Sequence, residues 1–135
     1  MTINKIAQGL HRLLLASLLV LGLAQAALAE PARAYTDAAF KAAMAEGKAV
    51  LVEVHADWCP ACKKQAPLLD ALSQEAPYTT IVRFRVDFDQ PGTALKTLKV
   101  NSQASLLLFK GNKEIARSAF DLDPRSIRTM LAKAG

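Results

Sequence analysis

Residues 36–135 predict an α/β domain with a central mixed sheet of four strands, with room for a short extra strand, flanked by helices. Two observations carry this prediction. Stretches of helical and of strand character alternate along the chain. The last two strands are separated only by Gly111-Asn112, a hairpin turn signal. Strands joined through helices favour a parallel part of the sheet, and the hairpin adds an antiparallel edge.

The first half of this domain predicts a helix, a strand and a second helix. "TDAAFKAAMAEG", residues 36–47, is alanine-rich and begins at Thr36, a good N-cap residue. Residues 48–56 hold a nearly continuous apolar, valine-rich run, which indicates a strand buried on both faces. The stretch 59–76 has leucines on one helical face, and Pro67 within it predicts a kink.

The second half predicts three more strands and two more helices. "TTIVRFRVDFD" alternates apolar and polar residues, as a strand does. The terminal helix is expected to begin after Asp123 as N-cap, with Pro124 in its first turn. In chain order the predictions are a strand over 79–89, a short helix over 91–100, strands over 104–110 and 114–120, and a helix over 123–135.

The N-terminus predicts export. Lys5 and Arg12 precede "LLLASLLVLGLAQAALA", residues 13–29, which carries no charge and ends on the small-residue pattern Ala27-Leu28-Ala29. This is the layout of a secretory signal peptide, so residues 1–29 are expected to be cleaved after Ala29. An uncut membrane anchor is the alternative, which is disfavoured because a bilayer requires about 20 apolar residues. Residues 30–35 are interpreted as a linker.

The charge pattern argues against nucleic acid as a partner. The formal net charge is +5, but the basic residues are dispersed and interrupted by acids. No basic run interleaved with aromatic residues is present. We expect a monomer that meets a membrane only through its N-terminal segment, and only if that segment stays uncleaved.

Cys59 and Cys62 are the only cysteines, and their spacing alone allows a zinc site, a structural staple or a reversible dithiol. Structural zinc takes four ligands, whereas this chain offers one cysteine pair plus His55. A disulfide that closes a two-residue loop removes little chain entropy, so it is a poor staple. Redox chemistry fits better, because Cys59 opens a helix whose free N–H groups stabilise negative charge on sulfur.

The sequence resembles the thioredoxin family over residues 36–135. "WCPAC" is similar to the family's Trp-Cys-x-x-Cys, "VLVEVHADWC" resembles the strand that enters its active site, and "LLLFKGNKE" resembles its later hairpin. The resemblance implies the thioredoxin fold and a redox-active disulfide, Cys59–Cys62, with Cys59 attacking and Cys62 resolving. It implies that Glu53 is a buried acid that moves protons to and from Cys62. The residues implied in substrate binding are Trp58, Pro60, Ala61, Ala104 and Ser105.

The chain departs from the family's pattern at Ala104-Ser105. Family members normally have a cis-proline there, which pairs with the substrate backbone and keeps metal ions from the cysteines. A cis bond costs about 2.5–4 kcal/mol before a residue other than proline, so the bond before Ala104 is expected to be trans. The family's glycine in the loop after the last strand is also replaced, and we assign that position to Asp121.

These observations predict an exported, periplasmic thiol–disulfide oxidoreductase that exchanges its dithiol with protein thiols and disulfides and needs no cofactor. The resemblance implies a reductase that receives electrons from a membrane thiol reductase. The alternative is a metal-binding protein in which the same cysteines hold Cu(I), or share an iron–sulfur cluster between two chains, with His55 assisting.

Overall fold

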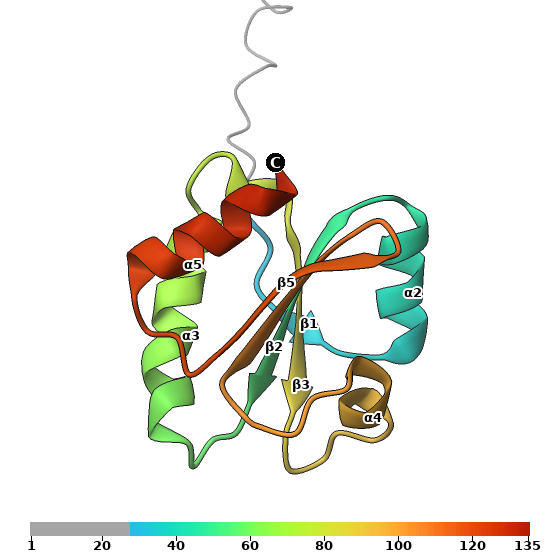
Figure 1. Cartoon of the computed structure of the whole chain (residues 1–135), viewed down its shortest axis with the longest axis vertical. Helices are drawn as coiled ribbons and strands as arrows, with labels where there is room; N and C mark the ends of the chain where they lie inside the picture. Colours follow the sequence, from blue (N-terminus) through green and yellow to red (C-terminus); the bar gives the residue numbers. More distant parts are fainter. Residues whose placement is uncertain (1–27) are drawn as a thin grey trace, which may run out of the picture.

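The computed structural model describes residues 28–135 (Figure 1). The predicted signal peptide lies outside the described residues except for Leu28 and Ala29, so its cleavage stays a prediction. Within residues 28–135, no helix has both the length and the apolar character needed to cross a membrane.

The sheet is mixed and has five strands in the order β1-β3-β2-β4-β5. β1 and β2 both run parallel to β3, whereas β4 is antiparallel to β2 and β5 to β4. The predicted four strands and their mixed directions are therefore confirmed. The strands are β1 (Arg33–Ala34), β2 (Ala49–His55), β3 (Val82–Asp87), β4 (Ser105–Lys110) and β5 (Lys113–Ala119).

The extra strand, β1, lies in the segment that the sequence predicted as a linker. Arg33 and Ala34 pair with Phe84 and Arg85 of β3. Just before β1, the backbone N–H and carbonyl of Ala29 form hydrogen bonds with the side chain of Gln74, at 3.1 and 3.2 Å. Hydrogen bonds at Ala29 and strand pairing at Arg33–Ala34 therefore hold this segment to the domain.

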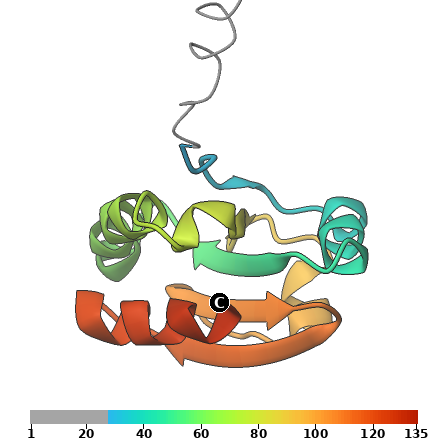
Figure 2. The same cartoon turned by 90° about the horizontal axis from the view of Figure 1, so that it is seen from above.

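Helices cover both faces of the sheet (Figure 2). α3 and α5 lie on one face, and α2 and α4 on the other. Thr36 and Asp123 cap α2 and α5 as predicted, since their side-chain oxygens accept from Ala39 N and Arg125 N. The helices are α2 (Asp37–Ala45), α3 (Pro60–Ser73), α4 (Ala94–Leu98) and α5 (Pro124–Leu131), with 3-10 turns η1 (Tyr78–Thr80) and η2 (Ala132–Ala134).

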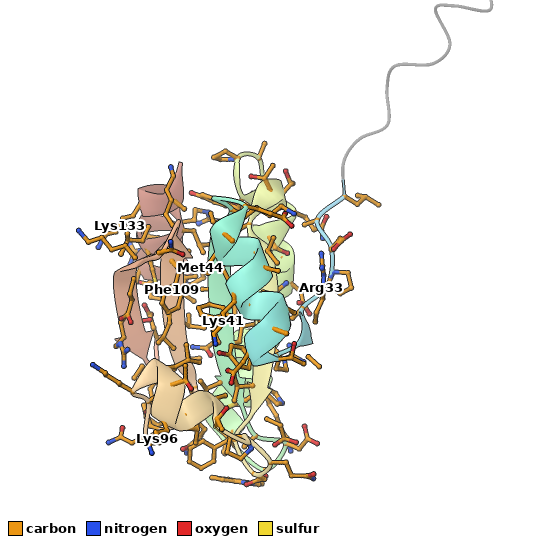
Figure 3. All side chains as sticks on the ribbon, turned by 90° about the vertical axis from the view of Figure 1, so that its right-hand side faces the viewer. Arg33, Lys41, Met44, Lys96, Phe109 and Lys133 are labelled. Atoms are coloured by element: carbon orange, nitrogen blue, oxygen red, sulfur yellow. The ribbon has the colours of Figure 1, made fainter. Side chains whose placement is uncertain are left out.

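Successive side chains of β2 point to opposite faces of the sheet, so this strand contributes to two apolar cores. Val52 belongs to the core under α2 and α4, whereas its neighbour Leu51 packs against α3 and α5. In Figure 3, Met44 of α2 and Phe109 of β4 lie near each other, and both belong to the first of these cores. Because β2 is buried on both faces, its C-terminal end is a rigid base for the residues that follow it.

Candidate active site

The two cysteines lie where β2 gives way to α3. Cys59 is the N-cap residue of α3, and its Sγ accepts a hydrogen bond of 3.1 Å from the backbone N–H of Cys62. Pro60 is in the first helical turn, where a missing N–H costs nothing. Both cysteines are free thiols, and they are 1% and 2% exposed. The helix start therefore directs a donor at the sulfur of Cys59, which favours negative charge there.

Cys62 has a different environment from Cys59. Its Sγ lies 3.9 Å from the carbonyl oxygen of Val54, to which it donates weakly. Burial, with a further contribution from the hydrogen bond to Cys59, raises the pKa of the Cys62 thiol above its ordinary value. A raised pKa keeps Cys62 protonated at neutral pH, so it becomes a nucleophile only when a proton is removed.

This difference predicts the alkylation behaviour of single-cysteine variants. In Cys59→Ser, Cys62 should react slowly with iodoacetamide at pH 7, and its rate should rise with pH up to its raised pKa, because only the thiolate reacts. In the matched variant Cys62→Ser, we expect Cys59 to react faster at pH 7. Mass spectrometry of timed samples measures both rates, and a faster Cys62 at pH 7 would contradict the prediction.

Apolar side chains surround the cysteines. Ala56 and Ala104 are fully buried against them, and Ala61 and Phe88 are partly buried in the same cluster. Pro60 is exposed and Ala61 half-buried. Apolar surroundings of this kind strengthen electrostatic effects at the sulfur atoms.

Trp58 lies at the surface next to Cys59 and is 56% exposed. Its indole Nε1–H donates to both carboxylate oxygens of Asp89, at 3.1 and 2.9 Å. Its ring packs edge-to-face with Phe88, with centroids 6.4 Å apart. Two contacts from the β3–α4 loop thus fix an exposed aromatic side chain beside the cysteine pair.

Glu53 is buried, as predicted, but its carboxylate is held by arginines. Oε1 accepts from Arg83 Nε at 2.7 Å, and Oε2 from Arg85 Nη2 at 3.2 Å. Arg83 also reaches α3, where its Nη1 lies 3.1 Å from Ser73 Oγ and 2.9 Å from Asp70 Oδ1. Among the hydrogen bonds of the described residues, none joins Glu53 to Cys62. The predicted proton-transfer role therefore has no direct contact to support it.

Ala104 packs directly against the cysteines, and its backbone has an unusual conformation. Its φ is +54°, the left-handed region, which a residue with a Cβ seldom adopts. The cis peptide bond within residues 28–135 is Ala76–Pro77, so the bond before Ala104 is trans. The Ala104 N–H donates to the Val54 carbonyl at 2.8 Å. Ser105 lies next to it as the first residue of β4, and its Oγ donates back to the Ser102 carbonyl of the preceding loop at 2.8 Å.

Two residues beside Ala104 were missed by the sequence analysis. Phe120, not Asp121, is the residue in the loop after β5 that adopts a positive φ, of 54°. Its N–H donates to the Ala104 carbonyl at 2.9 Å. Gln65 of α3 is buried, and its Nε2 donates to the carbonyl of Asp121 at 2.9 Å. One available signal was a polar residue in register with Leu69 and Leu72 on the buried face of α3.

The described residues give the metal-binding alternative little support. Across residues 28–135, no group of three or more histidine, cysteine, aspartate or glutamate side chains could hold a metal ion. His55, the expected assistant, instead places its Nε2 3.2 Å from Oδ1 of Asp57. Asp57 itself is fully exposed, whereas the His55 side chain is only 19% exposed.

Comparison with known proteins identifies similar sequences and structures. The family model described as Thioredoxin matches residues 31–133. The chain is 38% identical over 84 residues to the thioredoxin of Chlamydia muridarum, covering 62% of this chain and 80% of that protein. It is 32% identical over 97 residues to Thioredoxin-1 of Saccharomyces cerevisiae, covering 72% and 91%. The crystal structure of Trxlp from Edwardsiella tarda is similar with a TM-score of 0.72 and 37% identity, covering 74% of this chain and 97% of that one.

Proposed function

We propose that this chain, which belongs to the thioredoxin family and is a protein-disulfide oxidoreductase, acts outside the cytoplasm as a reductase in which Cys59 attacks and Cys62 resolves. The observation that carries the assignment of roles is the hydrogen bond from Cys62 N to Cys59 Sγ at the start of α3. It stabilises negative charge on Cys59, whereas burial keeps Cys62 protonated.

The proposed reaction proceeds in two exchanges. The Cys59 thiolate attacks one sulfur of a protein disulfide, so a mixed disulfide forms and the other substrate sulfur leaves as a thiolate that takes up a proton. Cys62 then loses its proton and attacks Cys59 Sγ. This step forms the Cys59–Cys62 disulfide and releases the second substrate thiolate. Two electrons have passed to the substrate, and a membrane thiol reductase restores the dithiol by the reverse chemistry.

The exposed surface beside Cys59 supports a protein as the substrate. Trp58 and Pro60 are exposed next to Cys59, and Ala61 is half-buried beside them. Ala104 is fully buried and the Ser105 hydroxyl is engaged with Ser102, so any contact of these two with substrate would be through the backbone.

Two measurements test the direction of the reaction: the redox potential of the dithiol at equilibrium, and the turnover of a disulfide-bonded protein. The domain from residue 30 onward is equilibrated in glutathione buffers, and its dithiol fraction is measured by alkylation and mass spectrometry. A reductase should have a potential nearer to about −270 mV than to about −120 mV. It should also reduce a disulfide-bonded protein when dithiothreitol supplies electrons. A potential at the oxidising end, with faster disulfide formation than reduction, would contradict the proposed direction.

Export is supported by the charge and hydropathy pattern of residues 1–29. In a bacterial host, the full chain should appear in the periplasmic fraction with the mass of a chain that begins at Glu30. A matched variant with Leu14, Leu15 and Leu19 replaced by aspartate should stay in the cytoplasm at full length. Retention of the unaltered chain in the cytoplasm would contradict export, and an unprocessed chain in the membrane fraction would indicate an anchor.

A further inference from the structure

The bond at which the signal is expected to be cut, between Ala29 and Glu30, is held by the folded domain. Ala29 is 8% exposed, whereas its neighbour Leu28 is 80% exposed. Gln74, at the C-terminal end of α3, engages both backbone groups of Ala29. Its Oε1 accepts from the Ala29 N–H at 3.1 Å, and its Nε2 donates to the Ala29 carbonyl at 3.2 Å. That carbonyl carbon is the atom that a peptidase attacks when it cuts this bond.

The residues after the bond are held as well. Glu30 forms an ion pair with Arg33. Arg33 and Ala34 pair with β3, and the N–H of Tyr35 donates to the carbonyl of Arg85 at 2.8 Å. In Figure 1 this segment enters from the upper end of the view, whereas α3 begins, with the cysteines, at the lower end. The contacts around the bond are therefore remote from the redox site.

A peptidase needs the same groups to be free. Extended polypeptides are commonly recognised through main-chain hydrogen bonds, and a peptidase that cuts after small residues takes the side chain before the bond into its pocket. In the folded chain, Gln74 occupies the backbone of Ala29, and the Ala29 methyl group is buried. Cleavage after folding therefore requires local opening of this segment, and its rate follows the population of the opened state.

We propose that Gln74 is a clamp that closes the Ala29–Glu30 bond to cleavage once the domain has folded, so that one chain yields two forms. This inference rests on the proposed export. Hydrolysis before folding adds water across the amide bond, which leaves a carboxylate on Ala29 and an ammonium group on Glu30, and frees the domain. A chain that folds first keeps the apolar segment 13–29 and stays at the membrane, where the proposed electron donor lies.

Limited proteolysis of the full chain in detergent micelles tests the clamp without any need for export. Pancreatic elastase, which cuts after small residues, is the probe, and mass spectrometry follows the product that begins at Glu30. The folded wild-type protein should give this product at least about a hundredfold more slowly than a free peptide of residues 24–35. Gln74→Ala removes both hydrogen bonds to Ala29, so it should speed the cleavage by about tenfold.

Gln90→Ala is the matched variant, because among the described residues Gln90 takes part in a hydrogen bond through its backbone N–H rather than its side chain. It should be cut at the wild-type rate. Gln74→Glu keeps an acceptor for the Ala29 N–H but loses the donor to the carbonyl, so its rate should lie between those of wild type and Gln74→Ala. Cleavage within residues 36–135 should be equal in all four proteins, because only the N-terminal segment opens.

Pulse-labelling in a bacterial host tests the two forms. Part of the wild-type chain should be cut rapidly and reach the periplasm, and an uncut remainder should persist in the membrane fraction. Gln74→Ala should convert most of this remainder to the form that begins at Glu30, because its segment opens after folding. Gln90→Ala should leave the remainder unchanged.

Three results would overturn the inference: cleavage of the folded wild-type chain as fast as the free peptide, equal rates at the Ala29–Glu30 bond in Gln74→Ala and Gln90→Ala, or an uncut remainder that Gln74→Ala does not reduce. A matching rise in cleavage within residues 36–135 of Gln74→Ala would also overturn it, since the variant would then act through global unfolding. Retention of every variant in the cytoplasm would instead contradict the proposed export, whatever the elastase rates.

Discussion

Replacing Cys59 by serine is expected to abolish reduction of protein disulfides, with a loss of about 10³-fold or more. A serine hydroxyl at the N-cap can still accept from Cys62 N, so α3 should keep its start. The hydroxyl is, however, far less acidic than a thiol and cannot form a disulfide. Turnover of a disulfide-bonded protein with dithiothreitol as electron donor measures the effect.

The companion variant Cys62→Ser separates the two cysteine roles. It retains the proposed attacking sulfur but lacks the second nucleophile, so the mixed disulfide with substrate should accumulate and appear on non-reducing gels. Cys59→Ser should give no such adduct. If Cys62→Ser turned over normally, or if Cys59→Ser trapped the substrate instead, the assigned roles would be reversed or unnecessary.

Local signals predicted the helices and the hairpin well because their causes are local. Thr36 and Asp123 cap helices through hydrogen bonds to residues two or three positions ahead. Gly111 adopts a positive φ of 55°, as the turn between β4 and β5 requires. β1 was not assigned, because two residues carry no periodicity of their own. That strand exists through its pairing with β3.

The missed site residues depend on contacts between distant segments. Arg83 lies in an alternating strand, a pattern in which a charged residue normally faces solvent, yet its side chain is 2% exposed. Its burial depends on Glu53, thirty residues earlier, and on Asp70 and Ser73 of α3. The conformation of Phe120 likewise depends on Ala104 and Gln65. Composition and spacing give no direct measure of such contacts.

Replacing Arg83 by methionine is expected to lower the free energy of unfolding by about 3–5 kcal/mol, because it leaves the Glu53 carboxylate buried with only the longer contact to Arg85. Urea unfolding followed by the fluorescence of Trp58, the single tryptophan, measures the loss. The matched variant Arg128→Met breaks a surface ion pair with Glu75, at 2.8 Å, and should cost only about 0–1 kcal/mol. A loss of under about 1 kcal/mol in Arg83→Met would contradict the prediction.

The double variant Glu53→Leu with Arg83→Met connects this ion pair to the chemistry. Removing both charges leaves no uncompensated carboxylate, so much of the stability lost in Arg83→Met should return. Its rate of disulfide exchange then tests the predicted proton-transfer role of Glu53 without the confounding effect of unfolding. A fall in the Cys62 step, seen as accumulated mixed disulfide that clears faster as pH rises, would support that role. A normal rate would mean that Glu53 and Arg83 serve to fix α3, and with it the cysteines, on the sheet.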